Sequence, residues 1–198
     1  MSYLDPKFLV ETLGLIGTPL IIFAESGLFF GFFLPGDSLL FTAGLLASQE
    51  LIPLIPLLIL CFLGAVLGDS VGYWFGKKVG PKLFTKEDSF FWNKKHVEKS
   101  HRFFEMHGKK AIIIARFMPI VRTFTPIIAG VGSMEYKTFL RYNVIGGFVW
   151  VCGLILGGFA FGNIIPDPDR YLLPVIIAII VISILPALKE IINNKKQK

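Results

Sequence analysis

The stretch Phe33-Leu34-Pro35-Gly36-Asp37 places a proline, a glycine and a carboxylate in the middle of apolar sequence. A second stretch, which runs from Arg116-Phe117-Met118-Pro119 to Arg122-Thr123, does the same with two arginines. A membrane helix tolerates such a break only where the freed backbone groups are buried in protein or face a water-filled cavity. Charged side chains inside a membrane usually mark a functional site. We therefore expect the two breaks to form one polar site inside a membrane protein.

The composition of the chain also indicates a membrane protein. Of the 198 residues, 54% are hydrophobic and 17% are charged, whereas about a quarter of the residues of a soluble domain are charged. The apolar residues form long uncharged runs, which is typical of segments inside a bilayer. We expect one membrane domain over residues 1–198, without a separate soluble enzyme domain. Neither catalytic residues nor a cofactor are expected.

The positive charge is concentrated beside the apolar segments. The net charge is +6, and half of the 20 Lys and Arg residues lie in the basic segment 77–110, with more in the tail 189–198. Bases in these places are typical of topology signals and contacts with anionic lipids, so a nucleic acid partner is not expected. The positive-inside rule places both basic segments in the cytoplasm.

The first half of the chain, residues 8–76, contains three predicted elements. Residues 8–16 form a short amphipathic helix on the membrane surface, or else the start of the next helix. Residues 18–48 are divided at Pro35-Gly36 into two pieces, each shorter than the ~20 residues that a crossing needs. They form a re-entrant hairpin or, alternatively, one kinked span. Residues 51–76 form a membrane span with a glycine at every fourth position, which is typical of a helix-packing seam.

The second half repeats this order. Residues 111–132 form a second broken hairpin, and residues 143–162 form a second span that contains glycines, so that the second unit covers residues 111–163. A last apolar span follows at residues 171–188. We predict an all-α integral membrane protein with an inverted repeat of surface helix, re-entrant hairpin and Gly-rich transmembrane helix, plus a C-terminal transmembrane helix. Interrupted segments at corresponding places in two halves are a good pointer to a transport site.

The three histidines give no indication of a metal site. His96, His101 and His107 all fall in the basic segment, and their spacings of five and six differ from the i, i+4 pair of a helical metal site. They are interpreted as solvated surface residues, and no metal is expected.

The charges of the two hairpins have opposite signs. Glu25 and Asp37 lie in the first hairpin, and Arg116 and Arg122 lie in the second. We expect them to pair across the two tips or to line a hydrated cavity. Two arginine forks suit a phosphate, and a buried carboxylate can take up and release a proton. The alternative is a pair of ion pairs that only hold the hairpins together.

Asp69 is a secondary candidate. It lies one position away from the glycine seam of the first span. A carboxylate without a partner in that apolar run would be costly.

Four motifs in order resemble the DedA membrane-protein family. They are Glu25, the Phe33-Leu34-Pro35-Gly36-Asp37 turn, Gly68-Asp69-x-x-Gly72-Tyr73-x-x-Gly76 and Arg116-Phe117-x-Pro119-x-x-Arg122-Thr123-x-x-Pro126-x-x-Ala129-Gly130, with Asn143-x-x-Gly146 and Trp150 beyond them. The resemblance covers residues 10–165 and implies two opposed re-entrant hairpins. It also implies translocation of a lipid carrier, which in bacterial members is undecaprenyl phosphate returned across the cytoplasmic membrane. Related eukaryotic proteins are lipid scramblases.

The resemblance also assigns roles to residues. The essential acidic pair of the family falls on Glu25 and Asp37, for proton coupling or gating, and its arginine pair falls on Arg116 and Arg122. With Thr123, these arginines are the candidate substrate-binding residues. The expected partners are an anionic polyprenyl phosphate lipid, the bilayer and protons, and the expected location is the bacterial cytoplasmic membrane.

Three other functions stay open at the level of sequence. The same acidic residues suit a proton-coupled cation transporter that acts in pH homeostasis without a lipid. A membrane phosphatase would need a nucleophile or metal cluster that the motifs do not supply. A scaffold or assembly factor would use the charges only for packing.

Overall fold

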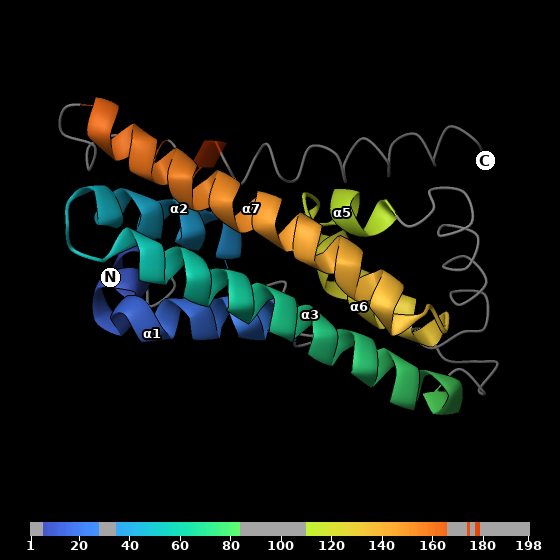
Figure 1. Ribbon diagram of the computed structural model, residues 1–198. Helices are drawn as coiled ribbons and strands as arrows, with labels where there is room; N and C mark the ends of the chain where they lie inside the picture. The colour runs from blue at the N-terminus through green and yellow to red at the C-terminus, as the bar shows by residue number, and fades with distance from the viewer. Residues whose placement is uncertain (1–5, 28–34, 84–109, 166–173, 175–176, 179–198) are drawn as a thin grey trace.

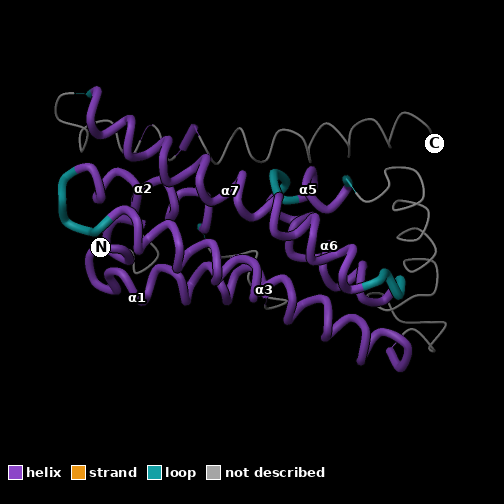
Figure 2. Tube along the Cα trace, in the orientation of Figure 1, coloured by secondary structure: helices purple, strands orange, loops and turns teal. Residues whose placement is uncertain are grey.

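The computed structural model describes residues 6–27, 35–83, 110–165, 174 and 177–178. All regular structure in these residues is helical, as predicted. The helices are α1 (Pro6–Gly27), α2 (Gly36–Ser48), α3 (Leu54–Leu83), α5 (Ala111–Ala115), α6 (Pro119–Val131) and α7 (Tyr136–Ile164) (Figure 1). Short connections join α2 to α3 and α6 to α7, as Figure 2 shows.

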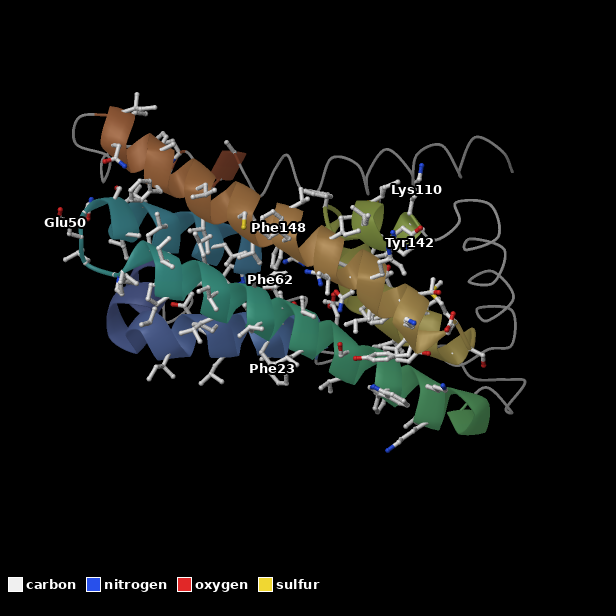
Figure 3. All side chains as sticks on the ribbon, in the orientation of Figure 1. Phe23, Glu50, Phe62, Lys110, Tyr142 and Phe148 are labelled. Atoms are coloured by element: carbon white, nitrogen blue, oxygen red, sulfur yellow. The ribbon has the colours of Figure 1, made fainter. Side chains whose placement is uncertain are left out.

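Two helices are long and apolar enough to cross a membrane. They are Leu54–Val79 within α3 and Tyr136–Ile164, which is α7. Large apolar side chains on both helices are exposed, including Leu63 at 45% and Phe148 at 59%. Exposed apolar faces of this size suit contact with lipid. Phe62 of α3 meets Phe148 of α7 edge to face, with ring centroids 6.2 Å apart (Figure 3). The two predicted Gly-bearing spans are therefore confirmed as long apolar helices.

The short helix α2 packs closely on α7. A Cβ atom on Gly44 would overlap the backbone carbonyl of Ile155, and a Cβ atom on Gly158 would overlap that of Phe41. Only glycine lets two helix backbones approach this closely.

The short helix α6 packs on α3 in the same manner. A Cβ atom on Gly130 would overlap the carbonyl of Tyr73, and one on Gly76 would overlap that of Ile127. In both contacts the carbonyl that faces a glycine lies three positions before the glycine of its own helix. The predicted packing role of the glycines is confirmed here.

Helix α1 lies along the first half of α3. The carbonyl oxygens of Pro19 and Phe23 each lie 2.6 Å from the position that a Cβ atom would take on Gly64 and Gly68, respectively. The glycine seam of α3 therefore serves two partners, with α1 on its first half and α6 on its second half.

A kink at Gly14 divides α1. Gly14 has φ 57° and ψ −149°, a conformation that side-chain-bearing residues rarely adopt. The predicted separate helix over residues 8–16 thus ends earlier than expected, at Gly14. The part of α1 after the kink and the 13-residue α2 are both shorter than the ~20 residues of a full crossing.

Both breaks identified in the sequence coincide with helix starts. Helix α2 begins at Gly36, directly after Pro35. Helix α6 begins at Pro119, preceded by Met118 in an extended conformation. Pro119 occupies the first position of α6, where proline is favoured because the N–H that it lacks would have no intrahelical acceptor. Phe33 and Leu34 lie outside the described residues.

Several predicted segments also fall outside the described residues. They are most of the basic segment with its three histidines, the span at residues 171–188 apart from positions 174, 177 and 178, and the basic tail.

Candidate functional site

Seven polar side chains from six segments of the chain meet in the interior. We call this set the polar cluster: Glu25 of α1, Asp37 of α2, Asp69 of α3, Arg116 directly after α5, Arg122 of α6, and Asn143 and Trp150 of α7. Its members are well shielded, with exposed fractions of 1% for Glu25, 4% for Arg116 and 0% for Asn143. Charged groups this deep are stable only when they are paired.

Arg122 joins α1 and α2 through their carboxylates. Its Nη2 donates to Oε1 of Glu25 and its Nη1 donates to Oδ1 of Asp37. One guanidinium therefore pairs with two carboxylates from different helices. The predicted pairing of the acidic side chains with an arginine is confirmed for Arg122.

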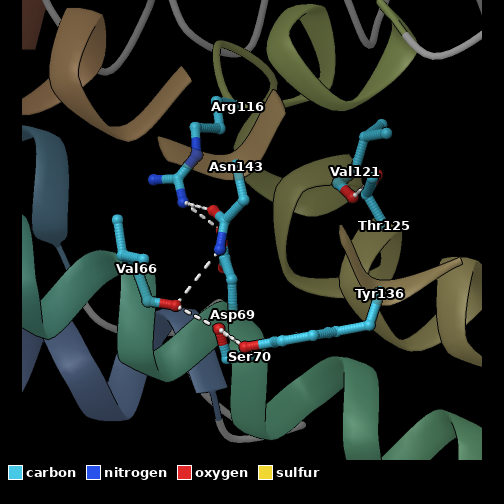
Figure 4. Close-up of polar contacts among 8 residues, drawn as sticks. All are labelled: Val66, Asp69, Ser70, Arg116, Val121, Thr125, Tyr136 and Asn143. Carbon is cyan, nitrogen blue, oxygen red and sulfur yellow. Dashed lines mark hydrogen bonds and ion pairs between the residues drawn. The ribbon is translucent and has the colours of Figure 1, made fainter. Parts of the chain in front are cut away.

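Arg116 has different partners from those expected. Its Nη2 donates to Oδ2 of Asp69 and to Oδ1 of Asn143 (Figure 4). The amide nitrogen of Asn143 in turn donates to the backbone carbonyl of Val66, at 3.1 Å. Glu25 and Asp37 both pair with Arg122, and Arg116 pairs instead with the carboxylate of Asp69 in α3. Asp69 is thereby placed in the polar cluster and paired.

Trp150 connects the two arginines. Its Nε1 donates to Oδ1 of Asp37 at 2.9 Å, the same oxygen that accepts from Arg122. The guanidinium carbons of Arg122 and Arg116 lie 4.7 and 5.8 Å from the centroid of its ring. Both distances are within the range of cation–π attraction.

Local structure explains why Glu25 and Asp37 lie side by side. A Cβ atom on Gly36 would overlap the carboxylate of Glu25, so the start of α2 approaches α1 only because residue 36 is glycine. Asp37 lies in the first turn of α2, where the positive end of the helix dipole favours a carboxylate.

The polar cluster is negatively charged when all of its groups are ionised. Three carboxylates face two guanidiniums, which leaves one formal negative charge. Oε2 of Glu25 and Nε of Arg116 are buried, and neither has a hydrogen-bond partner among the residues that the structure describes. The cluster therefore keeps one acceptor and one donor that its own residues do not satisfy.

Thr123, the third candidate substrate-binding residue, is buried beside the polar cluster residue Arg122. It is 3% exposed on α6, next in sequence to Arg122.

Within the parts of the chain that the structure describes, no three His, Cys, Asp or Glu side chains are arranged to hold a metal ion.

Sequence reasoning did not select Asn143 and Trp150 as site residues. The available signal was an amide inside an otherwise apolar span, since such a group must find a partner within the protein. Trp150 gave a weaker signal, because tryptophan is common in membrane spans for reasons of packing and depth.

Comparisons with known proteins agree with this architecture. The VTT domain matches residues 34–160. The chain is 46% identical to Protein DedA of Escherichia coli K12 over 179 residues, which cover 89% of this chain and 81% of the relative. It is 45% identical to an uncharacterized membrane protein of Mycobacterium tuberculosis over 93% of this chain and 84% of the relative. Inner membrane protein YghB of E. coli K12 is 31% identical over 76% of this chain and 68% of the relative. No solved structure matches the chain.

Proposed function

This chain belongs to the DedA family of VTT-domain membrane proteins, and from that premise we propose that it translocates an anionic lipid across the cytoplasmic membrane. The proposed lipid is undecaprenyl phosphate, returned for reuse as a carrier, and its movement is linked to protons. Arg116, Arg122 and Thr123 bind the phosphate, while Glu25 and Asp37 take up protons and gate the site.

The observation that carries the proposal is the pairing of Arg122 with two carboxylates. A phosphate monoester offers the same kind of acceptor as a carboxylate and carries about −1.5 to −2 charges at neutral pH. It can replace Glu25 and Asp37 on Arg122, because the guanidinium fork binds either group in bidentate fashion. The site would thus be closed by its own acidic residues when no lipid is bound.

Charge balance links this exchange to protons. A polar cluster with one formal negative charge would become strongly negative if it also received a phosphate, which is costly in a buried site. Protonation of Glu25 and Asp37 removes two negative charges and releases Arg122 at the same time. One proton-dependent event therefore opens the site and compensates the charge of the lipid.

The packing of the short helices supports two opposed re-entrant hairpins. The contact of α2 with α7 and that of α6 with α3 use glycines at matching positions, as an inverted repeat requires. In this proposal the second hairpin enters from the cytoplasmic side and the first from the opposite side. Their tips meet at the polar cluster, and the lipid tail stays in the bilayer.

A transport assay tests the proposal. Purified protein is reconstituted into liposomes that contain undecaprenyl phosphate in one leaflet, and movement of the lipid to the other leaflet is measured. We expect acceleration by the wild type, loss with Arg122→Ala and no change with Arg141→Ala, which alters an exposed arginine of α7. Wild-type protein that does not accelerate the movement would overturn the proposal.

Two further measurements separate the alternatives. The excess negative charge of the polar cluster also suits a proton-coupled cation transporter, which would change the pH inside vesicles that lack the lipid. A scaffold would tolerate exchange of the paired charges, as in Asp37→Arg combined with Arg122→Asp. An anion site would not tolerate this exchange, because the arginine that binds the phosphate would then lie on α2 instead of α6.

A further inference from the structure

Trp150 makes more polar contacts than its place in the apolar core requires. Its side chain is 3% exposed and packs with apolar residues of α2 and α7. The same side chain donates to Asp37 and presents its ring to both arginines. Packing in an apolar core requires none of these polar contacts, so we look for a role of the indole beyond packing.

We propose that Trp150 is a positioning residue that holds Asp37 while Arg122 exchanges its carboxylate partners for the phosphate of the lipid. This inference rests on the proposed function and adds a residue to it. Trp150 itself need not touch the substrate.

The hydrogen bond to Asp37 supplies the first part of the argument. Oδ1 of Asp37 accepts from Arg122 and, at 2.9 Å, from Nε1 of Trp150. When Arg122 turns to a phosphate, the indole still donates to Asp37, and keeping this hydrogen bond lowers the cost of moving the arginine away from the carboxylate. The indole N–H does not titrate, so this donor is present at every pH.

The ring supplies the second part. Arg122 and Arg116 lie 4.7 and 5.8 Å from the same ring centroid. Attraction to a common π-face holds two like charges near each other and offsets part of their repulsion. Two guanidiniums kept close together in this way can bind the oxygens of one phosphate.

The ionisable groups around the indole belong to five segments. They are Asp37 of α2 and the two arginines, which contact Trp150, and then Glu25 of α1 and Asp69 of α3, which contact the arginines. A change in the indole N–H acts first on Asp37. It should therefore alter the transport step that depends on this carboxylate more than the affinity for the lipid.

Two substitutions separate the N–H from the ring. Trp150→Phe keeps an aromatic face and removes the donor, and Trp150→Leu removes both. We expect Trp150→Phe to lower the maximal transport rate about tenfold or more, the size of one hydrogen bond to a buried charge, with little change in the lipid concentration at half-maximal rate. It should also displace the pH profile of transport. Trp150→Leu should in addition raise the half-saturating lipid concentration. The control is Trp74→Phe, a half-exposed tryptophan of α3.

Equal rates and pH profiles for wild type and Trp150→Phe would overturn the inference. So would a loss that follows only the amount of folded protein.

A second measurement does not depend on transport. The loss of Tm in detergent is compared for Trp150→Phe, Asp37→Asn and the double variant. Non-additive losses support the positioning of Asp37 even if the wild type moves no lipid, in which case the proposed function alone fails. Additive losses overturn the inference whether or not the lipid moves.

Discussion

The contact of α2 with α7 and the contact of α3 with α6 have the same close backbone packing but differ in the charged side chains beside them. Each brings two helices together through a pair of glycines that face the carbonyls of the other helix. The charged side chains near these contacts differ in sign: α1 and α2 supply Glu25 and Asp37, while the second half of the chain supplies Arg116 and Arg122. Close packing of helix backbones is thus the same in both contacts. The charges of the two halves must instead be opposite, because groups of like charge would repel each other in a buried site.

A second difference lies between the two arginines. Arg122 bridges the carboxylates of two separate helices, α1 and α2. Arg116 is held by Asp69 of α3 and by Asn143, which is itself bonded to a carbonyl of α3. The position of Arg122 therefore depends on how α1 and α2 are placed, and the position of Arg116 depends on the two long helices α3 and α7.

Removal of Arg122 should have the largest effect. Arg122→Ala leaves Glu25 and Asp37 together without their cation, and loss of one partner of a buried ion pair costs about 3–5 kcal/mol. We expect a decrease of this size in the free energy of unfolding, measured in mixed micelles, together with loss of lipid transport.

The pH dependence of this variant checks the cause. Without Arg122, the buried carboxylate of Glu25 can be neutralised by protonation, so the deficit relative to wild type should shrink as the pH falls. Arg141→Ala, which removes an exposed charge of α7, should show neither the deficit nor its pH dependence. A deficit independent of pH would mean that lost packing, and not charge, is responsible.

Substitution of the contact glycines should have the next largest effect. Gly44→Ala and Gly130→Ala each direct a methyl group at a backbone carbonyl, which cannot move aside as a flexible side chain would. We expect a loss of about 2–3 kcal/mol for each, within the range for overpacked sites, measured by the same unfolding assay.

A third glycine provides the control for this pair. A Cβ atom on Gly153 has no atom within 4 Å, so Gly153→Ala should be neutral or stabilising by up to about 1 kcal/mol. Equal losses at Gly44 and Gly130 would sharpen the comparison of the two contacts. A loss at only one of them would show that they are not equivalent.

The sequence was sufficient to predict the helices, the breaks and the glycine seam. Each of these depends on local features: long apolar runs, proline at helix starts and glycine at every fourth position. The predicted end of the first short helix, at residue 16, lies two residues after the kink at Gly14, because the apolar pattern continues through Gly14 and a positive φ leaves no trace in hydropathy. The available signal was the glycine at position 14, which lies inside an otherwise apolar run.

The pairing within the polar cluster was only partly predictable. Opposite signs on the two hairpins indicated that they would meet, and Arg122 meets both carboxylates. Which arginine pairs with which acid depends on helix rotation and on the crossing of α3 with α7, and neither is encoded in local spacing. Asp69 and Asn143 lie 74 positions apart in the sequence and share one nitrogen of Arg116.

Asn143→Ala should have an intermediate effect and tests whether Arg116 is held as firmly as the comparison implies. The change removes one of the two acceptors of Nη2 and the donor to the carbonyl of Val66, and it leaves the ion pair with Asp69 intact. We expect a loss of about 1–3 kcal/mol in the free energy of unfolding, because two buried hydrogen bonds are lost. A loss as large as that of Arg122→Ala would show that Asn143, and not Asp69, is the main support of Arg116.

The smallest effect should come from the tyrosine hydroxyls at the end of the contact between α3 and α6. The hydroxyl of Tyr136 donates to Ser70 at 3.3 Å and is only partly buried, and Ser70 keeps its own bond to the carbonyl of Val66. Tyr136→Phe should therefore cost less than about 1 kcal/mol.

Tyr73 is fully buried, and its hydroxyl donates to the carbonyl of Met134 in the turn before α7. Tyr73→Phe leaves that carbonyl without this donor while preserving the ring that stacks on Phe139, so it should cost more than Tyr136→Phe in the same unfolding assay. The reverse order would mean that the turn between α6 and α7 is held mainly through Ser70 of α3.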